Sequence, residues 1–242
     1  MYNPLEDIYQ QSAEQQYELG DRLALDDGRV FRYAKAGEAL VAGRLKQSAA
    51  TGGNTTEQVN MAVAVASVVN KNSVTLTADT DAITANQFKD GYLVVYSGTA
   101  SQGGGQTYKI ESNGAASAAG NFSVITYEPH KVAISTSAKA SVCKNPYDSV
   151  IIYPTTSTGM PVGVPLIAVS ANYYCWLQTW GICGVWNDAG GGLTVAADVL
   201  ASNQTAGGVE ADDAAKAQQR IGYPVYAGAA SKCSPIFLQI AP

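Results

Sequence analysis

In AVAVASVVNKNSVTLT, residues 62–77, apolar side chains alternate with small or hydroxylated ones. In an extended chain Val63 and Val65 would point to one side, and so would Val74 and Leu76 further along. A period of two with β-branched residues is typical of strands that bury one face. The stretch therefore predicts neighbouring strands of a β-sheet.

Strands of the same kind are expected on both sides of this stretch, because alternating segments recur between glycine-rich turns along most of the chain. The segments are residues 22–25, 29–33, 92–96, 107–111, 121–127, 131–135, 149–153, 164–169, 173–180, 182–186 and 235–240. Only Ala211–Arg220, with the sequence ADDAAKAQQR, predicts a helix, and it is short. The fold class is therefore predicted as all-β, with sandwich- or barrel-like domains and little helix.

The same pattern divides the chain into three parts. Residues 1–19 are polar and are predicted to form an N-terminal arm, either exposed or docked on a partner, with a short helix near the start as an alternative. Residues 20–61 and 144–242 are predicted to form the main β domain, which would carry the contacts with other subunits. Residues 62–143 are predicted to form a second β domain, inserted between the two halves of the main one.

Charged residues are scarce, at 14% of the chain against roughly a quarter in an average globular domain. Such a surface favours contact with other proteins, because interface centres are depleted of charge. The net charge of −5 and the pI near 4.8 argue against a nucleic-acid partner, which requires a basic surface. The sequence has no apolar run long enough for a membrane span, and it begins without the basic and apolar regions of a signal peptide. We therefore expect a protein that works without nucleic acid, membrane or export.

The residue types present give little support to catalysis. His130 is the only histidine, so a serine or cysteine nucleophile would have a single candidate base. Three carboxylate pairs would suit a glycoside hydrolase, but they fall in predicted turns or at the predicted helix start, where turn and capping bonds explain them. They are Asp26 with Asp27, Asp79 with Asp81, and Asp212 with Asp213. We expect no catalytic, cofactor-binding or metal-binding residues.

The cysteines all lie in the C-terminal part of the chain and none belongs to a CxxC pair, which argues against a zinc site. In a reducing cytosol they would remain buried thiols, whereas after release from the cell they could form disulfides. The candidates for a disulfide or crosslink are Cys143, Cys175, Cys183 and Cys233. Both interpretations stay open at this point.

An aromatic cluster, YYCWLQTWG at residues 173–181, stands out in the main domain. In a regular strand Tyr174, Trp176 and Trp180 would share one face. Such a face is either core, a contact surface for a protein partner, or a flat platform for sugars. Together with Trp186, these three residues are the candidate interface.

Three groups of glycine-rich motifs occur in a fixed order from Leu19 onward. They are LGDRLALDDGRVFRY (19–33) with ALVAG (39–43); DGYLVV (90–95) with GQTYKIESN (105–113); and NPY (145–147), VGV (162–164), YYCWLQTWG (173–181), AGG (206–208) and IG (221–222). In this order they resemble the head decoration, or cement, proteins that are encoded beside the major capsid gene in tailed bacteriophages.

The resemblance implies a structural virion protein, assembled in the host cytoplasm and located on the capsid exterior. Its partners would be the major capsid protein, bound across junctions between subunits, and further copies of itself, commonly in a homotrimer. The resemblance carries over no catalytic residue and no cofactor.

One departure from the pattern is Cys175, which stands between Tyr174 and Trp176 where the group is expected to have glycine. Together with Cys183 nearby, it favours disulfides between neighbouring subunits, which would resist the pressure of packaged DNA. Two other functions remain open. One is a different virion surface component with a carbohydrate-binding or adhesive role, and the other is a carboxylate-based glycoside hydrolase.

Overall fold

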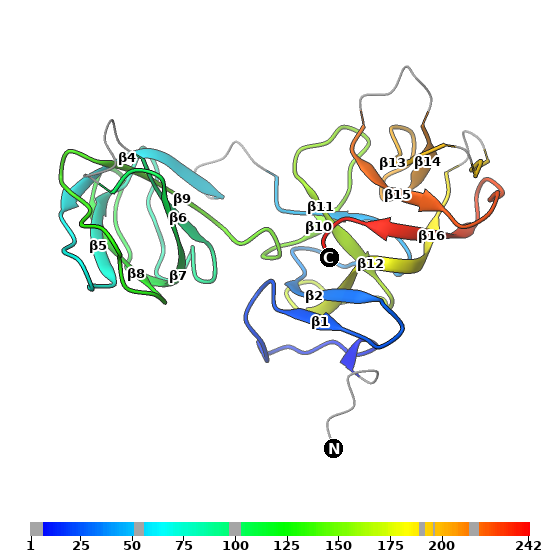
Figure 1. Ribbon diagram of the computed structural model, residues 1–242, viewed down its shortest axis with the longest axis horizontal. Coiled ribbons are helices and arrows are strands. Elements are labelled where there is room, and N and C mark those ends of the chain that lie inside the picture. Colours follow the sequence, from blue (N-terminus) through cyan, green and yellow to red (C-terminus); the bar gives the residue numbers. More distant parts are fainter. Residues whose placement is uncertain (1–6, 51–55, 97–102, 189–191, 196, 213–217) are drawn as a thin grey trace. The chain divides into compact units, whose positions relative to one another are not determined.

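The structure is a computed structural model that describes residues 7–50, 56–96, 103–188, 192–195, 197–212 and 218–242. The elements in this part of the chain are all strands, so the predicted all-β fold class is confirmed. The chain divides into two compact units (Figure 1). Unit 1 comprises Met1–Ala50 and Pro146–Pro242, and unit 2 comprises Thr51–Asn145.

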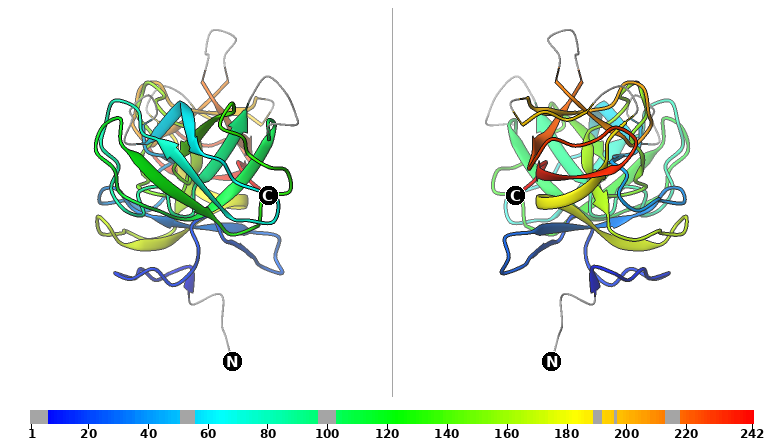
Figure 2. Two further views of the ribbon diagram at one scale, coloured as in Figure 1. Left: turned by 90° about the vertical axis from the view of Figure 1, so that its left-hand side faces the viewer. Right: turned by 90° about the vertical axis from the view of Figure 1, so that its right-hand side faces the viewer.

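Unit 2 is a closed barrel with the strand order β4-β5-β8-β7-β6-β9 (Figure 2, left). Its strands are β4 (Glu57–Val65), β5 (Ser73–Thr77), β6 (Tyr92–Tyr96), β7 (Gln106–Asn113), β8 (Asn121–Thr126) and β9 (Lys139–Cys143). The barrel closes where β4 pairs antiparallel with β9, in a register that places Glu57 opposite Cys143. Inward-facing residues such as Val63, Val74 and Leu76 form one core, as expected for a small barrel.

Three details of the prediction for unit 2 differ from the structure. Val65 is exposed rather than buried with Val63, because the register between β4 and β5 shifts between these two residues. Residues 131–135 form no strand and contribute only a bridge from Ile134, because both sides of β4 are already paired, with β5 and β9. Finally, β4 begins at Glu57, before the boundary that was predicted at residue 62.

Unit 1 is a ten-stranded antiparallel sheet (Figure 2, right). Its strands are β1 (Arg22–Ala24), β2 (Val30–Lys35), β3 (Lys46–Gln47), β10 (Ile151–Ile152), β11 (Pro161–Pro165), β12 (Tyr174–Trp186), β13 (Val199–Ala201), β14 (Val209–Ala211), β15 (Arg220–Pro224) and β16 (Cys233–Gln239). The first part of β12 pairs with β2 and β11, and its second part pairs with β16. The hairpin predicted around the turn at Asp26–Gly28 is confirmed as β1 and β2.

Strand β12 is continuous where the sequence predicts two strands, and it contains a bulge. The register shifts between Gln178 and Trp180, so Thr179 is an extra residue relative to β2. The Thr179 hydroxyl donates a hydrogen bond of 2.6 Å to the carbonyl of Ala241, and the Thr179 carbonyl accepts one of 3.0 Å from the Ile240 amide. The bulge is therefore stabilised by the segment that follows β16.

The helix predicted over Ala211–Arg220 is wrong at both of its ends. Ala211 closes β14 and Arg220 opens β15, and both of these strands pair with β13. Residues 213–217 lie outside the described part of the chain. At Ala211 and Arg220, pairing with a distant strand has overridden the local helix propensity.

The N-terminal arm, as far as it is described, packs against unit 1 instead of standing exposed. Ile8 and Leu19 are buried together with Phe31 and Trp176, and Ser12 is bridged to Tyr174. The arm therefore supplies part of the core of unit 1. The helix considered near its start falls mainly on residues 1–6, which lie outside the described part of the chain.

The single histidine is fully buried in unit 2 between two hydroxyl groups. Nδ1 of His130 lies 2.6 Å from Oγ of Ser67, and Nε2 lies 3.2 Å from Oγ1 of Thr126. The imidazole ring packs on Tyr108 with a centroid separation of 4.7 Å. Burial lowers the pKa of His130, because the imidazolium would lose its hydration, and the opposing attraction of Glu128 is smaller.

This histidine predicts that unit 2 becomes less stable in mild acid. The folded state binds the proton more weakly than the unfolded chain, so the free energy of unfolding falls as the pH drops below about 6.5. Hydrogen exchange in residues 106–113 measures this in the barrel, because all three tryptophans lie in unit 1. With exchange rates converted to protection factors, which removes the pH dependence of intrinsic exchange, His130→Gln should show a smaller acid-induced loss of protection, and an equal loss in both proteins would contradict the assignment.

A second prediction concerns the close packing of β15 on β16. A Cβ at Gly222 would overlap the carbonyl oxygen of Phe237, so Gly222→Ala should lower the free energy of unfolding by about 1–3 kcal/mol. Gly184 in β12 is the matched control, because nothing lies within 4 Å of a Cβ built there. Denaturant unfolding followed by tryptophan fluorescence compares the two variants. If Gly184→Ala costs as much stability as Gly222→Ala, the described register of β15 and β16 is wrong.

Candidate binding face

One side of the sheet formed by β12, β16 and β15 carries exposed apolar side chains. Along β16, Ser234, Ile236 and Leu238 are buried, and the residues between them point to the opposite side. Residues opposite one another on antiparallel strands share a side of the sheet, so the register identifies their neighbours. The residues on this side, called the outer face below, are Trp180, Ile182, Trp186, Tyr223, Cys233, Pro235 and Phe237.

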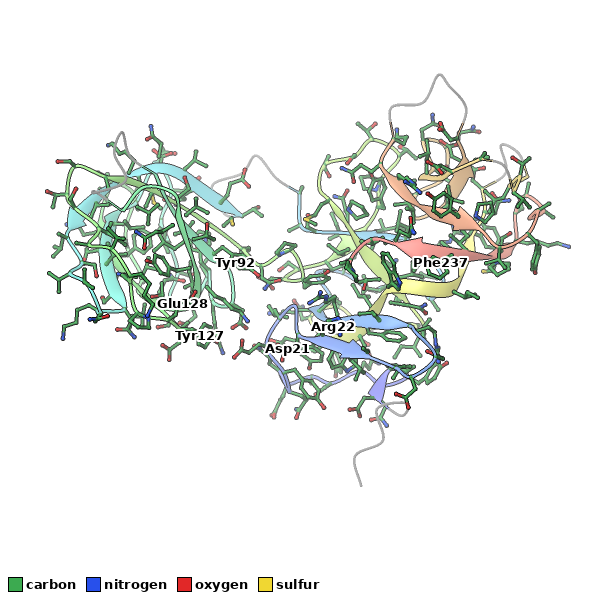
Figure 3. All side chains as sticks on the ribbon, viewed as in Figure 1. Asp21, Arg22, Tyr92, Tyr127, Glu128 and Phe237 are labelled. Carbon is green, nitrogen blue, oxygen red and sulfur yellow. The ribbon has the colours of Figure 1, made fainter. Side chains whose placement is uncertain are left out.

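A row of three side chains crosses the middle of the outer face. Phe237, labelled in Figure 3, lies opposite Ile182 on one side and opposite Tyr223 on the other. Ile182 is 55% exposed and Tyr223 is 42% exposed. Trp180 packs edge-on against Phe237, with ring centroids 5.7 Å apart and planes at 78°. A contiguous apolar surface of this kind is typical of a binding site.

A hollow of about 560 Å³ opens beside the row, between the β1–β2 turn and Trp180. Gly181 has a φ of +84°, and a Cβ there would come within 3.2 Å of the Gly28 carbonyl oxygen, so this position requires glycine. The turn itself is fixed by Asp27, which accepts hydrogen bonds from the backbone amide of Arg29 at 3.0 Å and from its Nε at 2.7 Å. These bonds lower the pKa of Asp27 below its ordinary value.

Further arginines lie against the aromatic rings of the outer face. The guanidinium of Arg220 is 4.2 Å from the ring centroid of Tyr223 and pairs with Asp198 at 3.1 Å. The guanidinium of Arg44 is 4.4 Å from the ring centroid of Trp186. A stacked guanidinium keeps donors at its edge, so it can still bind a carboxylate or a carbonyl of a partner. The outer face therefore combines an apolar centre with a hydrogen-bonding rim.

The predicted interface residues do not share one face. Trp180 and Trp186 lie on the outer face, whereas Trp176 is only 4% exposed and packs in a separate aromatic cluster beside Tyr174. The bulge at Thr179 is the reason, because an extra residue breaks the alternation that the sequence argument extended from Tyr174 to Trp180. The prediction of a single aromatic face is therefore wrong.

Several residues of the outer face were missed by the sequence argument. Ile182, Tyr223 and Phe237 come from three segments that are distant in sequence, and only the strand register brings them into one row. The run PIFLQI at residues 235–240 correctly indicated a strand. This run did not indicate which side of the strand would be buried, because it places apolar residues on both sides.

The described thiols are all free, and they differ in access to solvent. Cys175 and Cys183 are buried, which raises the pKa of each to about 12. Cys143 is half-buried, and burial also raises its pKa. Cys233 is exposed on the outer face, so the interpretation of four buried thiols is wrong for this residue. Among the described thiols, Cys233 has the best access to a second chain.

Two of the sites considered for catalysis, His130 and the loop at Asp79, are held by structural hydrogen bonds. Ser67 lies within hydrogen-bond distance of His130, but both are buried, so a substrate has no route to the hydroxyl. The loop at Asp79 is held by Gln58, whose Oε1 accepts a hydrogen bond of 2.8 Å from the Asp79 amide. Within the described ranges, no three histidine, cysteine, aspartate or glutamate side chains are grouped so that they could hold a metal ion.

Comparisons with protein-family models, curated proteins and solved structures find no match. Across the described part of the chain, no helix is long and apolar enough to cross a membrane.

The exposure of the thiols predicts their order of alkylation. Iodoacetamide should modify Cys233 first and Cys143 more slowly, because the thiolate is the reactive form and burial suppresses it. Cys175 and Cys183 should react only after unfolding. Peptide mass spectrometry of a time course assigns each site. Rapid modification of Cys183 in the native protein would show that the packing described behind β12 is incorrect.

Proposed function

We propose that this chain is a structural protein of a tailed-bacteriophage head that binds the outer surface of the capsid and stabilises junctions between major capsid subunits. The observation that carries the proposal is the outer face, whose apolar row and arginine rim suit burial against protein. The choice of the major capsid protein as the partner rests on the order of the motifs from Leu19 to Gly222, which resembles that of head decoration proteins.

The binding would rest on ordinary interface energetics and not on catalysis. A partner that covers the outer face would bury the exposed apolar surface of Ile182 and Tyr223. Each Å² of buried apolar surface contributes about 25 cal/mol to the binding free energy, before the costs of association are subtracted. Self-association, in a trimer under this proposal, would multiply the contacts that each particle makes and so raise the overall avidity. The acidic pI suits the exterior of the shell better than the side that faces DNA.

Crosslinking on the shell is part of the proposal. Cys233 is exposed on the outer face, so two copies, or a copy and a capsid subunit, can bring thiols together there. Disulfide formation removes two electrons and two protons from the thiols, and dioxygen met after release from the cell accepts them. The bond would make separation of the subunits depend on reduction.

The test uses empty heads assembled from a tailed-phage major capsid protein, the partner that this proposal assigns. The native protein should sediment with the heads, and Ile182→Asp should bind about tenfold more weakly, because a carboxylate at the centre of the face must be desolvated. Met160→Asp is the matched control, since Met160 is similarly exposed outside the outer face and its substitution should leave binding unchanged. Circular dichroism verifies that both variants are folded.

The outcomes separate the parts of the proposal. A native protein that stays monomeric and never sediments with heads would overturn the function. Equal weakening by Ile182→Asp and Met160→Asp would overturn the role of the outer face. Non-reducing gels of the sedimented heads examine the crosslink, which should be present in the native protein and absent in Cys233→Ser.

A further inference from the structure

A second hollow in unit 1, of about 340 Å³, lies beside the N-terminal segment and shares no residue with the outer face. Its volume falls in the range of sites that hold small molecules. Four aromatic residues line it, from the N-terminal segment, from β2 and from the start of β12. They are Tyr17, Tyr33, Tyr174 and Trp176.

The aromatic rings form a rigid floor around Tyr33. The ring centroid of Tyr33 is 5.1 Å from those of both Tyr17 and Trp176, and 5.8 Å from that of Tyr174, with which it is stacked at 8°. Tyr33 and Trp176 are almost fully buried, whereas Tyr17 and Tyr174 are half-exposed. The two partly exposed rings are therefore held in place by the buried ones, and Tyr17 is the ring at the edge of this cluster that lines the hollow from the N-terminal segment.

Polar side chains of the N-terminal segment form the rim of the hollow. Asp7 accepts a hydrogen bond of 3.1 Å from the hydroxyl of Tyr17, and Ser12 accepts one of 3.4 Å from the amide of Gln16. Gln10 and Gln11 complete the rim. Amide side chains present both donors and acceptors, which is what a ligand rich in hydroxyl groups requires.

One acidic side chain lines the hollow, and one basic side chain lies against an aromatic ring that lines it. Asp7 supplies a negative charge on the rim, and the ammonium of Lys35 lies 5.7 Å from the ring centroid of Tyr174. Because these two charges are opposite, together they favour neither a cation nor an anion. The site is therefore suited to a neutral ligand.

We propose that this hollow is a carbohydrate-binding site, which takes a neutral hexopyranose ring. The apolar C–H side of the sugar packs on the aromatic floor at Tyr17, and its hydroxyl groups bind the carboxylate and amides of the rim. This activity goes beyond attachment to a capsid and depends on different residues, so the two functions can succeed or fail separately.

The test is saturation-transfer NMR on the whole protein, with methyl α-glucopyranoside and methyl β-galactopyranoside as neutral probes and tetramethylammonium chloride as the charged probe. Saturable binding of at least one glycoside is expected. Tyr17→Leu, which keeps apolar packing but removes the aromatic ring and the bond to Asp7, should weaken it about tenfold, and Gln10→Ala should weaken it less. Tyr226→Leu is the control, because Tyr226 is an exposed tyrosine outside both surfaces.

Each other outcome counts against the site. Absence of saturable binding by both glycosides would overturn the proposal, and so would tighter binding of tetramethylammonium, which would indicate a cation cage. Binding that survives Tyr17→Leu but is lost in Tyr226→Leu would place the sugar elsewhere. Sedimentation with heads is a separate measurement. Tyr17→Leu should sediment with heads as the native protein does, whether or not the glycosides bind.

Discussion

Unit 1 is organised around the backbone pairing of β12. This strand is paired with β2 and β11 along its first part and with β16 along its second, and the bulge at Thr179 lies between the two parts. Before the bulge, Tyr174 and Trp176 build the floor of the aromatic hollow. After the bulge, Trp180 and Ile182 belong to the outer face. One extra residue thus divides a single aromatic run between two surfaces with different chemistry.

Much of the fold was predictable because its signals are local. The alternation in residues 62–77 and the turn at Asp26–Gly28 depend on neighbouring residues only, and both appear as strands and a hairpin. The errors occur where distant pairing decides. Ala211 and Arg220 have local helix propensity but pair with β13, and Ile134 forms a bridge to Ser67 instead of part of a strand.

The site was less predictable than the fold for a related reason. Trp180 and Trp186 were identified because tryptophan is conspicuous in any sequence, but Phe237 and Tyr223 join them only through register. Nothing local marks a bulge at Thr179, whose hydroxyl is satisfied by a carbonyl far along the chain at Ala241. The packing of the N-terminal segment was missed for the same reason. Its few apolar residues, such as Ile8, are buried against residues of β2 and β12, which are distant in sequence.

The order of the strands also bears on how the chain is synthesised. The barrel needs β4 and β9 and is complete once Cys143 has emerged from the ribosome, whereas β2 must wait for β12 before it gains its main partner. Residues 30–35 therefore remain unpaired with β12 while the whole of unit 2 folds, and their apolar side chains stay open to misassociation during that interval. Slow translation would thus affect the yield of folded unit 1 more than that of the barrel.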